Sequence, residues 1–337
     1  MTAAARAYSP LQLRSDEVSR HAVRLVVVGP EPSLTELARL PELLAPGDLV
    51  VVNDAATLPA SLRGTTAHDE RFELRLSGPI DGTRLFGVVM DDGDFQTRTE
   101  DRGPPPNIRA GDRIALGALS ATVIACAGRR VELVVNARPD VLWAHVYASG
   151  APIQYAHRPN ALPLYAVQTA YASRPFAAEM PSAGRPLTWN VLFGLRRAGI
   201  ELATLTHAAG LSSTGDAALD RALPWPERYE IPQRTLDAIA RVRRVIAIGT
   251  TVVRALESAH EPGAGTATLR LDGRYRPRVV DGIVSGLHVP GESHFELLSA
   301  FAPADQLERA MELAAAHGLS GHEFGDVCLV LAPRQQH

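Results

Sequence analysis

The chain has 337 residues, of which 46% are hydrophobic and 21% charged, and its net charge at pH 7 is −3. This length suits one large domain or two, and no apolar run approaches the roughly 20 residues of a membrane-spanning helix. All 34 basic residues are arginine, which excludes lysine Schiff-base chemistry and a phosphate-loop lysine. Because the net charge is negative, any contact with RNA must come from local arginine patches.

The ends and the cysteines indicate where the protein resides. The first residues lack the apolar core of a signal peptide, and the two cysteines lie far apart without a metal-binding spacing. We therefore expect a cytoplasmic protein with reduced cysteines and no membrane contact. The sequence leaves the oligomeric state open.

The first part of the chain suggests an α/β domain that is then interrupted. Apolar residues recur at helical spacing over 34–44, and a buried strand over 49–52 ends at a polar turn. From about residue 65 the pattern changes to short strands separated by turn signals. These strand-like runs lie at 72–78, 84–90, 112–117, 121–128 and 129–136.

Alternation of strand and helix resumes after residue 152. Helical patterns occupy 188–199, 231–243 and 307–318, and strands are predicted at 201–207, 245–248 and 327–332. Alternation on both sides of the β segment favours a layered or barrel-like α/β domain. The predicted organisation is a discontinuous α/β domain, residues 1–64 and 149–337, with a small all-β domain inserted over 65–148.

One junction suggests an anion site. The stretch RRVIAIGTTVVRALES, residues 243–258, joins a buried strand to a helix through Gly249, Thr250 and Thr251. Backbone N–H groups at a helix start, together with hydroxyls, suit an anion. Arg254 follows three to four residues later and can add a bidentate contact. The alternative is an ordinary strand–turn–helix whose threonine only caps the helix.

Other motifs are incomplete. GLSSTGD, residues 210–216, has the glycine spacing of a phosphate loop but lacks its lysine. We find neither a dinucleotide-binding glycine motif after an early strand nor a nucleophile elbow. His288 and His294 are six residues apart, a spacing that does not place both on one helical face. We therefore expect no metal site.

Motif-sized stretches recur in a fixed order along almost the whole chain. They are GDLVVVNDAATLPASLRG (47–64), VQTAYA (167–172), AAEMPSAGRPLT (177–188), TLTH (204–207), ERYEI (227–231), RRVIAIGTTVVRALES (243–258), GLHVPGESHFELLSAFA (286–302) and FGDVCLVL (324–331). In this order they resemble the S-adenosylmethionine:tRNA ribosyltransferase-isomerase family of queuosine biosynthesis. The resemblance implies a barrel-like α/β catalytic domain interrupted by a small β-barrel.

The resemblance also implies a reaction. The family transfers the ribosyl part of S-adenosylmethionine to 7-aminomethyl-7-deazaguanine in a tRNA anticodon arm and isomerises it, giving epoxyqueuosine, adenine and methionine. S-adenosylmethionine is then a co-substrate, and no metal is implied. Such chemistry needs a base beside the sulfonium, a proton donor for adenine, and polar groups for the methionine carboxylate and the exposed base.

Candidate residues follow from residue type and retained motif. His288 titrates in the range of a general acid or base, with His207 as the second candidate, and Arg254 completes the predicted catalytic set. The predicted substrate-binding residues are Asn53, Asp54, Gln168, Tyr171, Gly249, Thr250, Thr251, Glu227, Tyr229 and Asp326. A purely structural role is the alternative for each of them.

The chain also departs from the family pattern. Two motif arginines are replaced near Ala55 and Ser61, the Leu-His-Phe-Thr stretch loses its histidine, and Glu179 and Met180 are extra before Pro181. Glu292 stands in a segment where the family has a lysine, a serine and a threonine. Fewer cations weaken phosphate binding, so an acceptor other than tRNA, or a non-catalytic binding protein, is the alternative.

Overall fold

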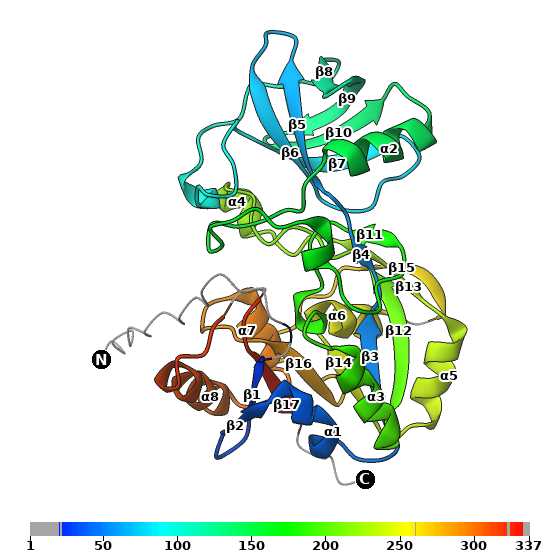
Figure 1. Cartoon of the computed structure of the whole chain (residues 1–337), viewed down its shortest axis with the longest axis vertical. Coiled ribbons are helices and arrows are strands. Elements are labelled where there is room, and N and C mark those ends of the chain that lie inside the picture. The colour runs from blue at the N-terminus through cyan, green and yellow to red at the C-terminus, as the bar shows by residue number, and fades with distance from the viewer. Residues whose placement is uncertain (1–19, 21, 260, 322–323, 333–337) are drawn as a thin grey trace.

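The computed structural model describes residues 20, 22–259, 261–321 and 324–332. Two parts are plain in Figure 1: a sheet covered by helices, and a separate barrel above it. The first residues, whose lack of a signal-peptide core led to the expected cytoplasmic location, lie outside the described residues. None of the described helices is long and apolar enough to span a bilayer.

The larger part is built on a nine-stranded mixed sheet. Its strands follow the order β15 (Gly263–Ala267), β13 (Glu227–Ile231), β12 (Glu201–His207), β3 (Asp48–Asn53), β14 (Arg244–Ile248), β16 (Gly282–Gly286), β17 (Val327–Leu331), β1 (Arg24–Val27) and β2 (Ser33–Glu36). Strands β12, β3, β14 and β16 run parallel, so their carboxyl ends meet at one edge. The predicted α/β class is confirmed, and the sheet is open, with β15 and β2 at its sides.

Strand β3 shows why helices cover both faces. Its side chains alternate between the faces, as strand geometry requires: Val50 and Val52 enter one core, and Leu49 and Val51 the other. All four are buried, which stabilises the fold by about 1.5–3 kcal/mol each. The first core is closed by α1 (Leu40–Leu43) and α3 (Trp189–Arg197); the second by α5 (Gln233–Arg241), α6 (Thr250–Ser258), α7 (Ser293–Leu298) and α8 (Ala304–Ala316).

The smaller part is a closed six-stranded barrel. Its strands are β5 (Ser61–Thr66), β6 (Arg71–Leu76), β7 (Arg84–Met90), β8 (Arg113–Leu116), β9 (Leu119–Ala127) and β10 (Arg130–Val135), and neighbours pair antiparallel. This confirms the expected β-barrel inside an α/β protein. The boundaries expected at residues 65 and 148 stay a prediction.

Two elements differ from the sequence predictions. Helix α2 (Pro139–Ser149) was not predicted. It packs Leu142 and Val146 into the barrel core, but Val141 and Tyr147 are exposed apolar residues on its other side, so no apolar stripe marks it as a helix. Residues 34–36 of the supposed helical pattern belong to β2, which pairs antiparallel with β1.

Short elements complete the chain. Strands β4 (Ala56–Thr57) and β11 (Pro175–Ala177) pair parallel in a separate two-stranded sheet. Helix α4 (Ala217–Asp220) and the 3-10 turns η1 (Leu37–Arg39), η2 (Thr99–Asp101), η3 (Leu164–Val167) and η4 (Ser182–Gly184) lie in the connections.

Candidate active site

A cavity of about 340 Å³ lies at the carboxyl edge of the parallel strands. Gly249 follows β14, Gly286 ends β16, and Gly210 follows β12, and all three line the cavity. Ligands of open α/β sheets bind beyond the carboxyl ends of the strands. The volume is within the usual range for a small-molecule site.

The start of α6 faces this cavity. Gly249 has φ +91° and its N–H donates to the carbonyl of Val284, so the chain turns sharply out of β14. Thr250 and Thr251, the first helical residues, line the cavity beside it. The first N–H groups of a helix have no partner within the helix and form its positive end. The expected anion cradle therefore faces a cavity, and its role stays a prediction.

Arg254, one turn into α6, is committed to a neighbour. Its Nη1 forms an ion pair with Glu227, and other N–H groups donate to the carbonyls of Trp225, Ala267 and Leu269. These contacts engage four of the five guanidinium N–H groups. Burial lowers the pKa of Arg254 to about 10, so it stays cationic at neutral pH. The geometry favours a role in fixing Glu227 over the expected bidentate contact with a substrate anion.

Glu227 lines the cavity and His207 lies behind it. Glu227 Oε1 accepts the N–H of Gly210 at 2.7 Å. His207 is fully buried, and burial lowers its pKa to about 3. Its Nε2 lies 3.6 Å from Glu227 Oε2, too far for a hydrogen bond. Because the ring is neutral and is not on the wall, the geometry favours packing over proton transfer for His207.

His288 follows β16 and lines the cavity. Its Nδ1 lies 3.2 Å from Glu292 Oε2. Because a carboxylate can only accept, Nδ1 is the donor, and in the neutral ring the lone pair is on Nε2. Burial raises the pKa of Glu292, but the hydrogen bond and charge of His288 outweigh it, so the pKa lies below its usual value. The cavity thus contains an imidazole oriented by a carboxylate.

His294 was weighed in the sequence only as half of a metal pair. Its ring stacks on that of His288, with centroids 4.6 Å apart. Burial, and next the charge of His288, lowers the pKa of His294 to about 3. It is therefore a neutral ring that packs against His288. Among the described residues, no group of three or more metal-ligating side chains occurs.

Glu179 is a second cavity residue that received no role from the sequence. It is only 9% exposed, and it accepts hydrogen bonds from the N–H and hydroxyl of Ser212 at 2.9 and 2.5 Å and from the hydroxyl of Tyr155. A single carboxylate after a short strand forms no sequence motif that would predict a site. Glu179 is held at the cavity by its contacts with residues 209–212, which follow β12.

Asn53 and Asp54 lie beneath the site. The Asn53 amide donates to the carbonyl of His207 at 3.0 Å and to Thr251 Oγ1 at 3.4 Å, so it ties two strand ends to the start of α6. Asp54 accepts from Thr206 Oγ1 at 2.6 Å. Neither residue is on the cavity wall, and their substrate-binding roles stay predictions.

Gln168 and Tyr171 make structural contacts away from the cavity. Gln168 pairs with the backbone of Thr57 through two hydrogen bonds of 2.9 Å. Tyr171 donates to the carbonyl of Gly184 at 3.3 Å, and burial raises its pKa. These contacts give both residues a structural role, and their substrate-binding roles stay predictions.

Tyr229 and Asp326 also lie apart from the cavity. Tyr229 belongs to the main hydrophobic core, and Asp326 is fully buried. The Asp326 carboxylate accepts from the N–H and guanidinium of Arg24, both at 2.8 Å. Asp326 therefore joins the start of β1 to the start of β17.

Comparison with known proteins identifies the family. A family model described as queuosine biosynthesis protein matches residues 5–330. The S-adenosylmethionine:tRNA ribosyltransferase-isomerase of Gloeobacter violaceus is 32% identical over 92% of this chain and 89% of that protein, and that of Thermus thermophilus is 32% identical over 96% of each. A solved S-adenosylmethionine tRNA ribosyltransferase from Thermotoga maritima matches 93% of both chains at 20% identity and a TM-score of 0.48, a likeness too weak to add to the argument. The chain belongs to the queuosine biosynthesis family, and the resemblance found in its sequence is confirmed.

Proposed function

We propose that this protein transfers and isomerises the ribosyl part of S-adenosylmethionine onto 7-aminomethyl-7-deazaguanine in a tRNA anticodon arm, with release of adenine and methionine. The proposal is carried by the gathering of family-motif residues at one cavity of a chain whose relatives share one name. The full-length relatives are enzymes of this name, and one cavity of this chain gathers Gly249–Thr251, Glu227, Arg254 and His288 from its family motifs. S-adenosylmethionine is the co-substrate, and the reaction involves no metal in this proposal.

The start of α6 binds the methionine carboxylate. The N–H groups after Gly249 point from the positive end of a helix, where an anion is stabilised. The hydroxyls of Thr250 and Thr251 lie beside them. The amide of Asn53, bonded to Thr251, keeps this hydroxyl in place.

His288 is the base that removes a proton from the carbon beside the sulfonium. Glu292 holds the proton on Nδ1, so Nε2 is free to accept one, and the carboxylate stabilises the imidazolium that forms. The imidazolium then carries the proton that the leaving adenine needs. His294 stacks on the ring and keeps its orientation.

Adenine release tests the proposal. Protein and S-adenosylmethionine are incubated with an anticodon stem-loop that carries the aminomethyl-deazaguanine, and with the same stem-loop carrying guanine. Adenine is expected only with the modified RNA. Release that does not depend on RNA would point to a different acceptor, and no release with the modified RNA would contradict the proposal.

The expected cytoplasmic location stays a prediction.

A further inference from the structure

A second cavity, of about 270 Å³, adjoins the candidate active site. The two cavities share part of their walls, at Gly210, Leu211, Leu223 and Glu227. The barrel contributes Phe86 of β7 and Arg130 of β10 to the second cavity. This cavity therefore lies where the barrel meets the sheet part, next to the place of the proposed reaction.

The second cavity combines aromatic rings with arginines. Phe86 is 43% exposed and lies outside the barrel core. The Arg130 guanidinium lies 4.4 Å from the centre of the ring of Trp225, which precedes β13, and Arg228 of β13 is a second cation on the wall. Aromatic rings and guanidinium groups are the surfaces on which proteins stack the bases of single-stranded RNA.

The charge of this wall is positive. Within the described part of the chain, the side chains of Arg130 and Arg228 form no ion pair, and each contacts an aromatic ring. Glu132, on the same outer face of β10 as Arg130, is paired with Arg84. The only acidic residue among the described wall residues is Glu227, which is paired with an arginine of α6. Such a wall suits a ligand that has both a base and a phosphate.

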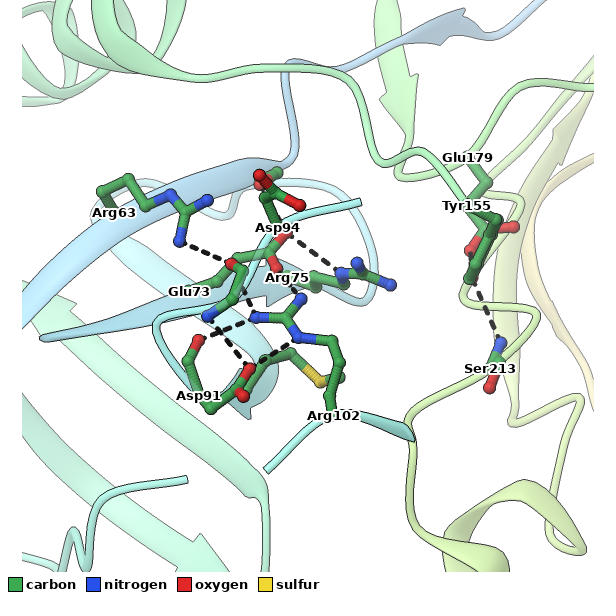
Figure 2. A network of polar contacts seen from close by, with 12 residues as sticks. Arg63, Glu73, Arg75, Asp91, Asp94, Arg102, Tyr155, Glu179 and Ser213 are labelled. Carbon is green, nitrogen blue, oxygen red and sulfur yellow. Dashed lines mark hydrogen bonds and ion pairs between the residues drawn. The ribbon is translucent and has the colours of Figure 1, made fainter. Parts of the chain in front are cut away.

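Buried contacts fix the barrel to the sheet part beside this cavity (Figure 2). Arg75 of β6, which is paired with a buried carboxylate of the barrel, lies 5.4 Å from the centre of the Tyr155 ring. Tyr155 Oη accepts the backbone N–H of Ser213 at 3.2 Å. Ser77 and Leu211, two residues from Arg75 and from Ser213 in the chain, line the cavity. Because its two sides are held together, binding there needs little rearrangement.

We infer that the second cavity binds the nucleotide that adjoins the target base of the RNA. The base of this nucleotide stacks on Phe86, and Arg130, held against Trp225, contacts its phosphate. The inference rests on the proposed function, which places the modified base in the neighbouring cavity. Because the two cavities share a wall, a base bound in the first leaves its neighbour in the RNA beside the second.

The stacking is tested with Phe86→Ala. Fluorescence anisotropy measures the dissociation constant of the stem-loop carrying aminomethyl-deazaguanine. Phe86→Ala should weaken binding by about 5- to 150-fold, the usual effect of removing a ring that stacks on one base. Phe193→Ala is the matched control, because Phe193 is 48% exposed on α3 and lines neither cavity. Its affinity should equal that of the wild type, and S-adenosylmethionine should bind equally to all three proteins.

The phosphate contact is tested with Arg130→Ala. Loss of one contact should lower the slope of log Kd against log salt concentration by about 0.7, the value for one phosphate of a single strand. Arg113→Ala, at an exposed position of β8 outside both cavities, removes the same charge from the barrel and should leave the slope unchanged. Equal slopes in Arg130→Ala and the wild type would overturn this contact.

Stem-loops with an abasic site on the 5′ or the 3′ side of the modified base identify the stacked nucleotide. On one side, the abasic site and Phe86→Ala should each weaken binding, and the two together should weaken it no further. Effects that multiply on both sides, or wild-type affinity in Phe86→Ala, would overturn the inference. If the wild type then still releases adenine with the modified RNA, the proposed function stands alone; a wild type that binds no stem-loop would overturn both.

Discussion

Burial and neighbouring charges determine the protonation state of the side chains at the cavity. His207 and His294 are neutral because burial lowers the pKa of each to about 3. Arg254 stays charged beside Glu227, and His288 keeps its proton on the nitrogen that faces Glu292. Of these histidines, His288 lines the cavity and has Glu292 within hydrogen-bond distance of its Nδ1, so its Nε2 is the nitrogen that the proposed reaction uses.

Arg254→Ala should cost stability. The variant leaves Glu227 buried without its cation, and breaking a buried pair costs about 3–5 kcal/mol. Urea unfolding measures the loss. Arg241→Ala is the control, since Arg241 pairs with Glu201 on the surface and such pairs contribute about 0–1 kcal/mol. Equal losses in the two variants would contradict the buried pair.

His288→Asn should slow adenine release by about 10²–10⁴-fold, the usual contribution of a general base. The dissociation constant of S-adenosylmethionine should change little, because the imidazole acts on the proton and does not anchor the ligand. Single-turnover kinetics separates the two quantities. His317→Asn, at the end of α8, is the control. A wild-type rate in His288→Asn would remove His288 from the mechanism.

Acid should destabilise the protein through His207 and His294. Their folded pKa of about 3 lies below the unfolded value of about 6.5. In that interval only the unfolded state binds the protons, so the free energy of unfolding falls as the pH falls, by about 1.4 kcal/mol per pH unit for each histidine.

His294→Gln should remove one histidine's share of this slope between pH 6.5 and 5. The slope is read from urea unfolding at a series of pH values, with His68→Gln at an exposed position as the control. An unchanged slope in His294→Gln would mean that the ring takes up a proton in the folded state.

At the scale of elements, the junction of β14 and α6 depends on Gly249. Its backbone, φ +91° and ψ 157°, is in a region that is nearly exclusive to glycine, and a side chain there costs on the order of 1–3 kcal/mol. A Cβ on Gly249 would also lie 3.4 Å from the Cβ of Ala183, which lines the same cavity.

Gly249→Ala should therefore lose stability and also weaken the binding of S-adenosylmethionine. Gly263→Ala is the control for strain alone, because Gly263 has φ +105° and no atom within 4 Å of an added Cβ. Unfolding should show a loss in both variants, and calorimetry a weaker ligand only in Gly249→Ala. Unaltered binding in Gly249→Ala would place the ligand away from α6.

Elements were predictable where the apolar period was clear. Strand 49–52 and the helix over 188–199 match β3 and α3, because a buried strand and an amphipathic helix each leave a strong pattern. The site was predictable at residues 249–251 and at His288, which are local to motifs. Glu179 was not, because its place depends on Ser212 and Tyr155, partners far away in sequence.

At the scale of the whole molecule, the β insertion was predictable and the order of strands was not. Short strands with turns at close intervals indicate an all-β unit, and residues 61–135 form the barrel. The open sheet depends on long-range pairings, such as β1 with β17, for which a strand's own sequence contains no signal.

The central claim is that the ribosyl carbons of S-adenosylmethionine end up in RNA. The most direct measurement uses S-adenosylmethionine labelled with ¹⁴C in its ribose, together with the stem-loop carrying aminomethyl-deazaguanine. After incubation with the wild-type protein the RNA is purified and counted. The account predicts label in the modified RNA and none in the stem-loop with guanine. Label that stays with small molecules while S-adenosylmethionine is consumed would contradict it.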